Sequence, residues 1–168
     1  GKGSKRVQLM GSGSILREVI AAANILAEDF GVQADVWSCP SFNELKRDGD
    51  DCVRWNLMHP DQKPRIPHVT ACLEKHSGPV VAATDYVKLF ADQIRAYVGR
   101  NYHVLGTDGF GRSDTRASLR RHFEVNRFYV TVAALKTLAD EGTIPAKTVK
   151  SAIRKYKLDP EKPNPLNV

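Results

Sequence analysis

The chain has 168 residues, of which 42% are hydrophobic and 26% charged, and its formal net charge is +6. This length favours a single domain, and no apolar run approaches the roughly 20 residues that a membrane-spanning helix needs. The basic charge is dispersed and lacks the interleaved aromatic residues typical of single-strand binders, so we expect neither a membrane nor a nucleic-acid partner.

The opening GKGSKR is polar and has no signal peptide, which favours a fragment of a longer, cytoplasmic chain. Residues 6–10 then alternate as a strand does, and a GSGS turn follows at 11–14. Apolar residues recur at helical spacing over 16–30 until Gly31, and residues 33–39 predict a second strand. Such a unit predicts a right-handed crossover and a parallel sheet with both faces covered.

The middle of the chain is less regular. Ser41 is expected to cap a helix that Gly49 interrupts, with an apolar pattern resuming at 55–58. Three prolines between residues 60 and 67 predict a surface connection, and a short helix follows at 69–73. Residues 79–84 form an apolar run typical of a strand buried on both faces, and a helix is expected from Asp85.

The next stretch, VLGTDGFGRSDTRASLRRHFEV at 104–125, combines a strand end, a glycine-rich turn and a helix. Gly106, Gly109 and Gly111 are expected to adopt positive φ values. Ser113 or Asp114 is expected to cap the helix. Its arginines are expected to remain in solvent: they are Arg112, Arg116, Arg120 and Arg121.

Two further helices are predicted over about 126–142 and 145–156, and residues 159–168 read as a frayed C-terminal tail. The elements together predict an α/β domain at 1–158. Its three layers would hold a mostly parallel sheet of four or five strands flanked by helices.

Two sets of residues could carry chemistry. Gly11 to Ser14 could hold a phosphate, but the third glycine of the dinucleotide fingerprint is missing, so a tight turn is favoured. Asp85 and Asp108 both follow strands, yet no nucleophile or base joins them, and capping is the preferred role. Cys39, Cys52 and Cys72 fit neither a disulfide framework nor a metal motif, and we expect reduced thiols.

Several stretches resemble one known family. GTDGFGRSDTRASLRRHFEV and FYVTVAALKTLADEG resemble the end of the bacterial homodimeric pyruvate dehydrogenases, the thiamine-diphosphate-dependent first components of their complex. The opening RVQLMGSGSILREVIAAANIL and the middle PVVAATDYVKLFADQIRAYV look like the same family in the same order. The resemblance implies a transketolase C-terminal-like domain.

The resemblance also implies an enzyme that decarboxylates pyruvate on thiamine diphosphate and Mg²⁺ and passes the acetyl group to a lipoyl-bearing dihydrolipoamide acetyltransferase. The family's metal-binding G-D-G and paired asparagines do not occur here, so no catalytic, cofactor-binding or metal residue is assigned to this chain. An inactive, architectural role is expected, in contact with the upstream domains and a homodimer partner. The candidate contact residues are Asp85, Tyr86, Thr107, Asp108, Arg112 and Arg116.

Two alternatives stay open at this point. One is a free-standing flavodoxin-like module that binds a phosphorylated ligand at Gly11 to Ser14 and at the cluster around Arg112. The other is a basic RNA-binding domain. An upstream reading frame with G-D-G and N-N would favour the dehydrogenase over both.

Overall fold

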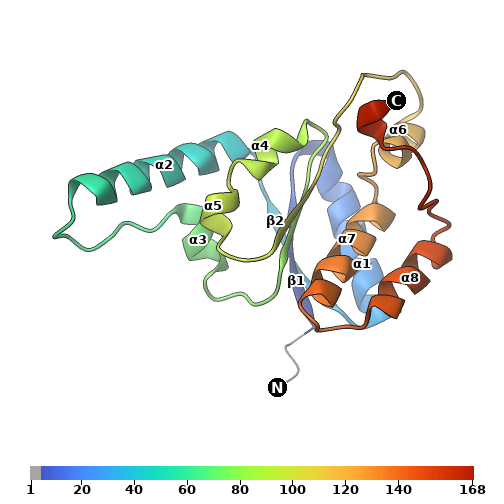
Figure 1. Ribbon diagram of the computed structural model, residues 1–168, viewed down its shortest axis with the longest axis horizontal. Helices are drawn as coiled ribbons and strands as arrows, with labels where there is room; N and C mark the ends of the chain where they lie inside the picture. The colour runs from blue at the N-terminus through green and yellow to red at the C-terminus, as the bar shows by residue number, and fades with distance from the viewer. Residues whose placement is uncertain (1–4) are drawn as a thin grey trace.

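The centre of the molecule is a four-stranded, wholly parallel sheet (Figure 1). The computed structural model describes residues 5–168, so most of the polar opening lies outside the described part. The strands are β1 (Arg6–Gly11), β2 (Gln33–Ser38), β3 (Val80–Ala83) and β4 (Tyr102–Leu105), in the order β2-β1-β3-β4. The predicted α/β class and strand number are confirmed.

One face of the sheet is covered by helices from both ends of the chain. These are α1 (Leu16–Phe30), α7 (Arg127–Asp140) and α8 (Ala146–Lys155). Because side chains alternate along a strand, Val7 and Leu9 of β1 and Val81 of β3 point to this face and pack with Leu26 and Leu138. Asn126 caps α7 as predicted, with its side-chain oxygen accepting from the Phe128 and Tyr129 amides.

The opposite face is covered by α2 (Phe42–Met58), α3 (His68–Leu73), α4 (Lys88–Asp92) and α5 (Arg95–Val98). Met10 of β1, together with Val80 and Ala82 of β3, packs here against Phe42 and Ile94. The two cores and the sheet between them give the predicted three layers (Figure 1). In the described part of the chain no helix is both long and apolar enough to span a membrane.

The predicted interruption of α2 at Gly49 is wrong, because the helix continues through it. Gly49 is buried against the Tyr97 ring of α5, and a Cβ at this position would overlap that ring. The glycine is therefore where two helices approach closely, a role that its neighbours in the sequence do not reveal.

The expectation for the segment after β3 also needs correction. No helix starts at Asp85; α4 begins at Lys88, and a second short helix, α5, follows it. Asp85 stays in the loop, where its carboxylate accepts a hydrogen bond from Ser14.

The loop after β4 differs from its predicted conformation as well. Only Gly109 of its three glycines has a positive φ, at 108°, while Gly111 lies in open space. The following helix, α6 (Arg116–His122), is capped by Thr115, whose hydroxyl accepts from the Ser118 amide, and not by Ser113 or Asp114.

The C-terminal tail is packed and not frayed. It ends in a 3₁₀ turn, η2 (Pro165–Asn167), with Pro165 buried. A Cβ on Gly109 would come within 2.5 Å of the Pro165 carbonyl oxygen, so the tail lies directly on the loop after β4. Lys162 donates to the His122 carbonyl and pairs with Glu124 at 3.1 Å.

Candidate domain-contact site

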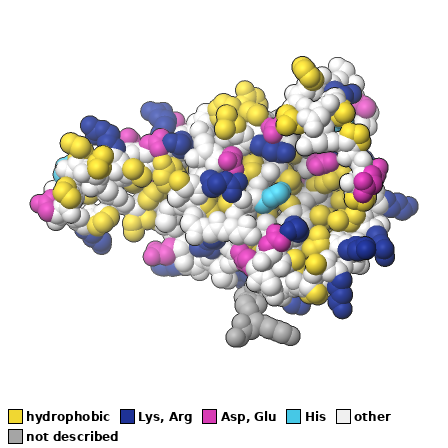
Figure 2. Space-filling view, in the orientation of Figure 1, with side chains coloured by type: hydrophobic (Ala, Val, Ile, Leu, Met, Phe, Trp, Pro, Cys, Tyr) yellow, Lys and Arg dark blue, Asp and Glu magenta, His cyan; other side chains and the backbone are white. Residues whose placement is uncertain are grey.

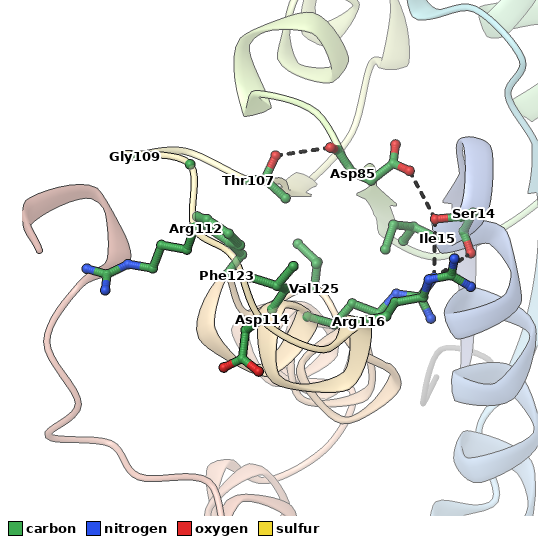
Figure 3. A pocket seen from close by; sticks show the side chains of 13 residues that line it. Ser14, Ile15, Asp85, Thr107, Gly109, Arg112, Asp114, Arg116, Phe123 and Val125 are labelled. Carbon is green, nitrogen blue, oxygen red and sulfur yellow. Dashed lines mark hydrogen bonds between the residues drawn. The ribbon is translucent and has the colours of Figure 1, made fainter.

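The loops that follow β1, β3 and β4 meet at the carboxyl edge of the sheet and surround a cleft of about 580 Å³ (Figure 3). Parallel strands deliver these loops to the same edge, which is where α/β sheets usually carry their functional residues. The lining side chains and loop positions are Ser14, Ile15, Asp85, Thr107, Gly109, Gly111, Arg112, Asp114, Arg116, Leu119, Arg120, Phe123 and Val125.

Asp85 joins the three loops (Figure 3). Its Oδ2 accepts a hydrogen bond of 3.0 Å from Ser14 Oγ, after β1. Its carbonyl oxygen accepts one of 3.1 Å from Thr107 Oγ1, after β4. The structure therefore brings together Asp85 and Thr107, residues that the sequence predicted for one site.

The loops after β3 and β4 are also joined through their backbones. The Thr107 amide donates to the Tyr86 carbonyl at 2.9 Å, and Asp108 Oδ1 accepts from the Lys88 amide at 2.8 Å. Asp108 thus caps α4, which precedes it in the chain, and not the helix that follows it. Gly106 permits this approach, since a Cβ there would lie 2.6 Å from the Tyr86 carbonyl oxygen.

A nearly buried ion-pair cluster lies beside the cleft. Glu18 of α1, with 7% of its side chain exposed, accepts from Arg120 at 3.0 Å and from the Arg127 side chain at 3.0 and 3.1 Å. The Arg127 amide adds a fourth hydrogen bond at 2.9 Å. Burial alone would raise the pKa of Glu18, but the hydrogen bonds from Arg127 and the charges of both arginines hold it below its usual value.

This cluster corrects the expectation that all the arginines of the stretch remain in solvent. Arg120 is only 15% exposed, and besides Glu18 it contacts the Ser14 carbonyl and hydroxyl oxygens. Arg112 and Arg116 are exposed as predicted. Arg112 points away from Ser14 and Asp85 in Figure 3, whereas Arg120 contacts Ser14.

Large apolar side chains are exposed at the same edge. The exposed fraction is 61% for Tyr86, 69% for Leu89 and 80% for Phe110. Tyr86 stacks at a tilt on Phe90, which is itself partly exposed, with ring centroids 5.0 Å apart. In Figure 2 hydrophobic side chains gather along the upper edge over α4. We name Tyr86, Leu89 and Phe90 the edge patch; Phe110 lies in the loop after β4.

Sequence reasoning named Tyr86 but missed Leu89 and Phe110. Leu89 belongs to a helical pattern, DYVKLF, whose apolar residues read equally well as core. Phe110 lies between two glycines, in the sequence GFG, so its neighbours have no side chains that could cover the ring. This pattern could have indicated that Phe110 is exposed.

The turn at Gly11 to Ser14 does not suit a bound phosphate. The Asp85 carboxylate oxygens lie 3.2 and 3.3 Å from where a Cβ on Gly13 would stand, so the turn at Gly11 to Ser14 faces a negative charge. Nor do the residues of the cleft fit magnesium diphosphate: within residues 5–168 no group of three or more His, Cys, Asp or Glu side chains is placed to hold a metal ion.

Comparisons with known proteins agree with this fold. The profile of the transketolase-like TK C-terminal domain matches residues 1–126. The chain is 61% identical over 163 residues to the pyruvate dehydrogenase E1 component of Cupriavidus necator, 60% over 162 to that of Pseudomonas aeruginosa, and 57% over 166 to that of Escherichia coli K12. These matches cover 96–98% of this chain but 18% of each relative, in its C-terminal part.

Proposed function

The chain belongs to the transketolase-like C-terminal domain family, and from that premise we propose that it acts as the C-terminal domain of a pyruvate dehydrogenase E1 component. The observation that carries this proposal is the 57–61% identity to three such components over 96–98% of the chain. The flavodoxin-like alternative has no comparable support, because its phosphate turn faces Asp85.

The parent enzyme, in this proposal, is a cytoplasmic homodimer that links glycolysis to acetyl-group metabolism. It decarboxylates pyruvate and transfers the acetyl group to the lipoyl carrier of dihydrolipoamide acetyltransferase. Thiamine diphosphate and Mg²⁺ supply the electron sink that side chains lack, and upstream domains hold them. The described residues of this chain contribute no ligand set for that cofactor.

The role of this domain is architectural: it packs on the upstream domains through the carboxyl edge of its sheet. Three features support this role. The edge patch is exposed, the loops beside it are fixed by Asp85 and Asp108, and the exposed Arg112 and Arg116 line the cleft at the same edge of the sheet. An apolar centre with arginine at the margin is a common composition for a protein interface.

The variant Leu89→Asp in the full-length parent tests this role. A carboxylate buried at the contact would cost several kcal/mol, so we expect weakened assembly and a fall in pyruvate-dependent acetyl transfer of at least about tenfold. Ile20→Asp is the matched control, because Ile20 is 48% exposed on α1, away from the edge. Wild-type assembly and activity in Leu89→Asp would contradict the proposed contact.

A further inference from the structure

The far half of α2 extends away from the rest of the domain. Figure 1 shows the helix leaving the sheet and the chain returning to α3 through an extended segment. Residues 42–52 of α2 are anchored by Phe42 and Cys52, which are buried, and by Gly49 against Tyr97. We call residues 53–67 the arm.

The arm exposes apolar side chains that the domain itself does not cover. The exposed fractions are 56% for Val53, 76% for Leu57, 63% for Met58 and 54% for Ile66. Val53, Leu57 and Met58 lie on the helix and Ile66 on the returning segment, so both parts of the arm carry exposed apolar side chains. Single exposed apolar residues are ordinary, whereas a group on one projection indicates a contact surface.

The arm is ordered by its own polar and aromatic contacts. Asn56 donates to the Arg65 carbonyl at 2.9 Å and accepts from the Arg65 amide at 2.8 Å. The Arg65 guanidinium lies 4.3 Å from the Trp55 ring centre, and His59 stacks on the same Trp55 at 4.4 Å. An arm that is already ordered loses little conformational freedom when it binds, which favours association.

We infer that the arm docks on the part of the parent polypeptide that precedes this domain. The inference rests on the proposed function. Relatives of this chain are more than five times its length, since it spans 18% of them, so most of such a polypeptide lies outside the structure. A free-standing interface typically involves about 20–30 residues on each partner, far more than these four side chains. A contact within one polypeptide needs less area, because the chain connection keeps the two surfaces at high effective concentration.

Met58 gives a direct measurement of whether the arm is covered. Peroxide converts an accessible thioether to the sulfoxide, and the rate falls when the sulfur is buried. In the 168-residue chain Met58 should oxidise nearly as fast as in unfolded protein, because it is 63% exposed. In the native full-length parent we expect oxidation at least about tenfold slower. Met10, 3% exposed, is the internal control and should be slow in both proteins.

Two outcomes would overturn the inference. Equal Met58 oxidation in the full-length parent and the 168-residue chain would show that the arm is free. Protection that disappears when the parent is diluted to monomers would show that a second copy covers the arm. Pyruvate turnover measured on the same samples separates the proposed function from the docking of the arm. A parent that turns over pyruvate but leaves Met58 exposed would contradict only the docking.

Discussion

At the scale of single residues, Glu18 connects the first helix of the chain to two arginines in its last third. It lies on α1, yet its partners Arg120 and Arg127 come more than a hundred residues later. The carboxylate is almost buried and accepts hydrogen bonds on both oxygens, so the cost of removing it from water is offset only while both arginines stay in place. The cluster holds α1, α6 and the start of α7 together beside the cleft.

Glu18→Gln should therefore destabilise the chain at neutral pH. We expect a loss of about 2 kcal/mol, less than for a wholly buried pair because Arg127 reaches solvent. The melting temperature should then fall by roughly 4–8 °C. Glu28→Gln is the control, because Glu28 is exposed on the same helix; an equal fall in both variants would contradict the role of the cluster.

The loss should also depend on pH in a defined direction. The folded-state pKa of Glu18 lies below its usual value of 4.5, so the charged cluster adds its full stability above about pH 4.5. That contribution disappears as the pH falls through the folded pKa. The difference between wild type and Glu18→Gln should accordingly shrink in acid, and a constant difference would point to packing instead of charge.

Sequence reasoning named four residues that line the cleft, Asp85, Thr107, Arg112 and Arg116, but could not pair them with their partners. Asp85 and Thr107 were predicted for one edge because each follows a strand, and parallel strands end on the same side. The partnership of Glu18 with Arg120 has no local signal, since a charged residue on a helix usually faces solvent. Gly109, and not Gly111, has a positive φ and lies close to the Pro165 carbonyl, a tertiary contact that has no signal in the local sequence.

At the scale of elements, some helices and strands could be predicted from the local sequence pattern, whereas others depend on tertiary contacts. β1, α1 and β2 were predicted well because periodicity and the Gly31 cap agree with their final packing. The continuity of α2 was missed because glycine is a poor helix former, and its reason lies on α5. The segment after Ala83 was read as one helix because Tyr86, Phe90 and Ile94 keep helical spacing across two short helices.

Gly49→Ala tests the close approach of α2 and α5. In an exposed helix this change would add stability, because alanine is favoured over glycine by about 1 kcal/mol. Here the new methyl group meets the Tyr97 ring, so we expect a net loss of about 1–3 kcal/mol and a lower melting temperature. Asp51→Ala, at an exposed position of α2, should be neutral or stabilising. A rise in melting temperature in both variants would show that Tyr97 moves aside without cost.

At the scale of the whole molecule, the two cores suggest a domain that holds itself together without a cofactor. One core joins α1, α7 and α8 to the sheet. The other joins the start of α2 and the helices α3, α4 and α5 to the opposite face of the sheet. Both cores consist of apolar side chains of the chain itself. The 168-residue chain should therefore unfold in one cooperative transition.

The same chain should bind no thiamine diphosphate. Calorimetric titration of thiamine diphosphate with Mg²⁺ into the 168-residue chain should give only heats of dilution, and the chain should consume no pyruvate. Addition of the upstream domains should restore both. Stoichiometric binding in the micromolar range by the isolated chain would contradict the architectural role, because such an affinity needs a specific site.

The strand order shows that the hydrogen bond from Ser14 to Asp85 lies at a special position of the sheet. In the order β2-β1-β3-β4, the direction of chain progression reverses between β1 and β3, and open α/β sheets usually bind their ligands in the crevice at that reversal. Ser14 follows β1 and Asp85 follows β3, so their 3.0 Å bond crosses the crevice itself. The topological switch point of this domain thus joins two of its own loops, in the place where other proteins of this architecture hold a ligand.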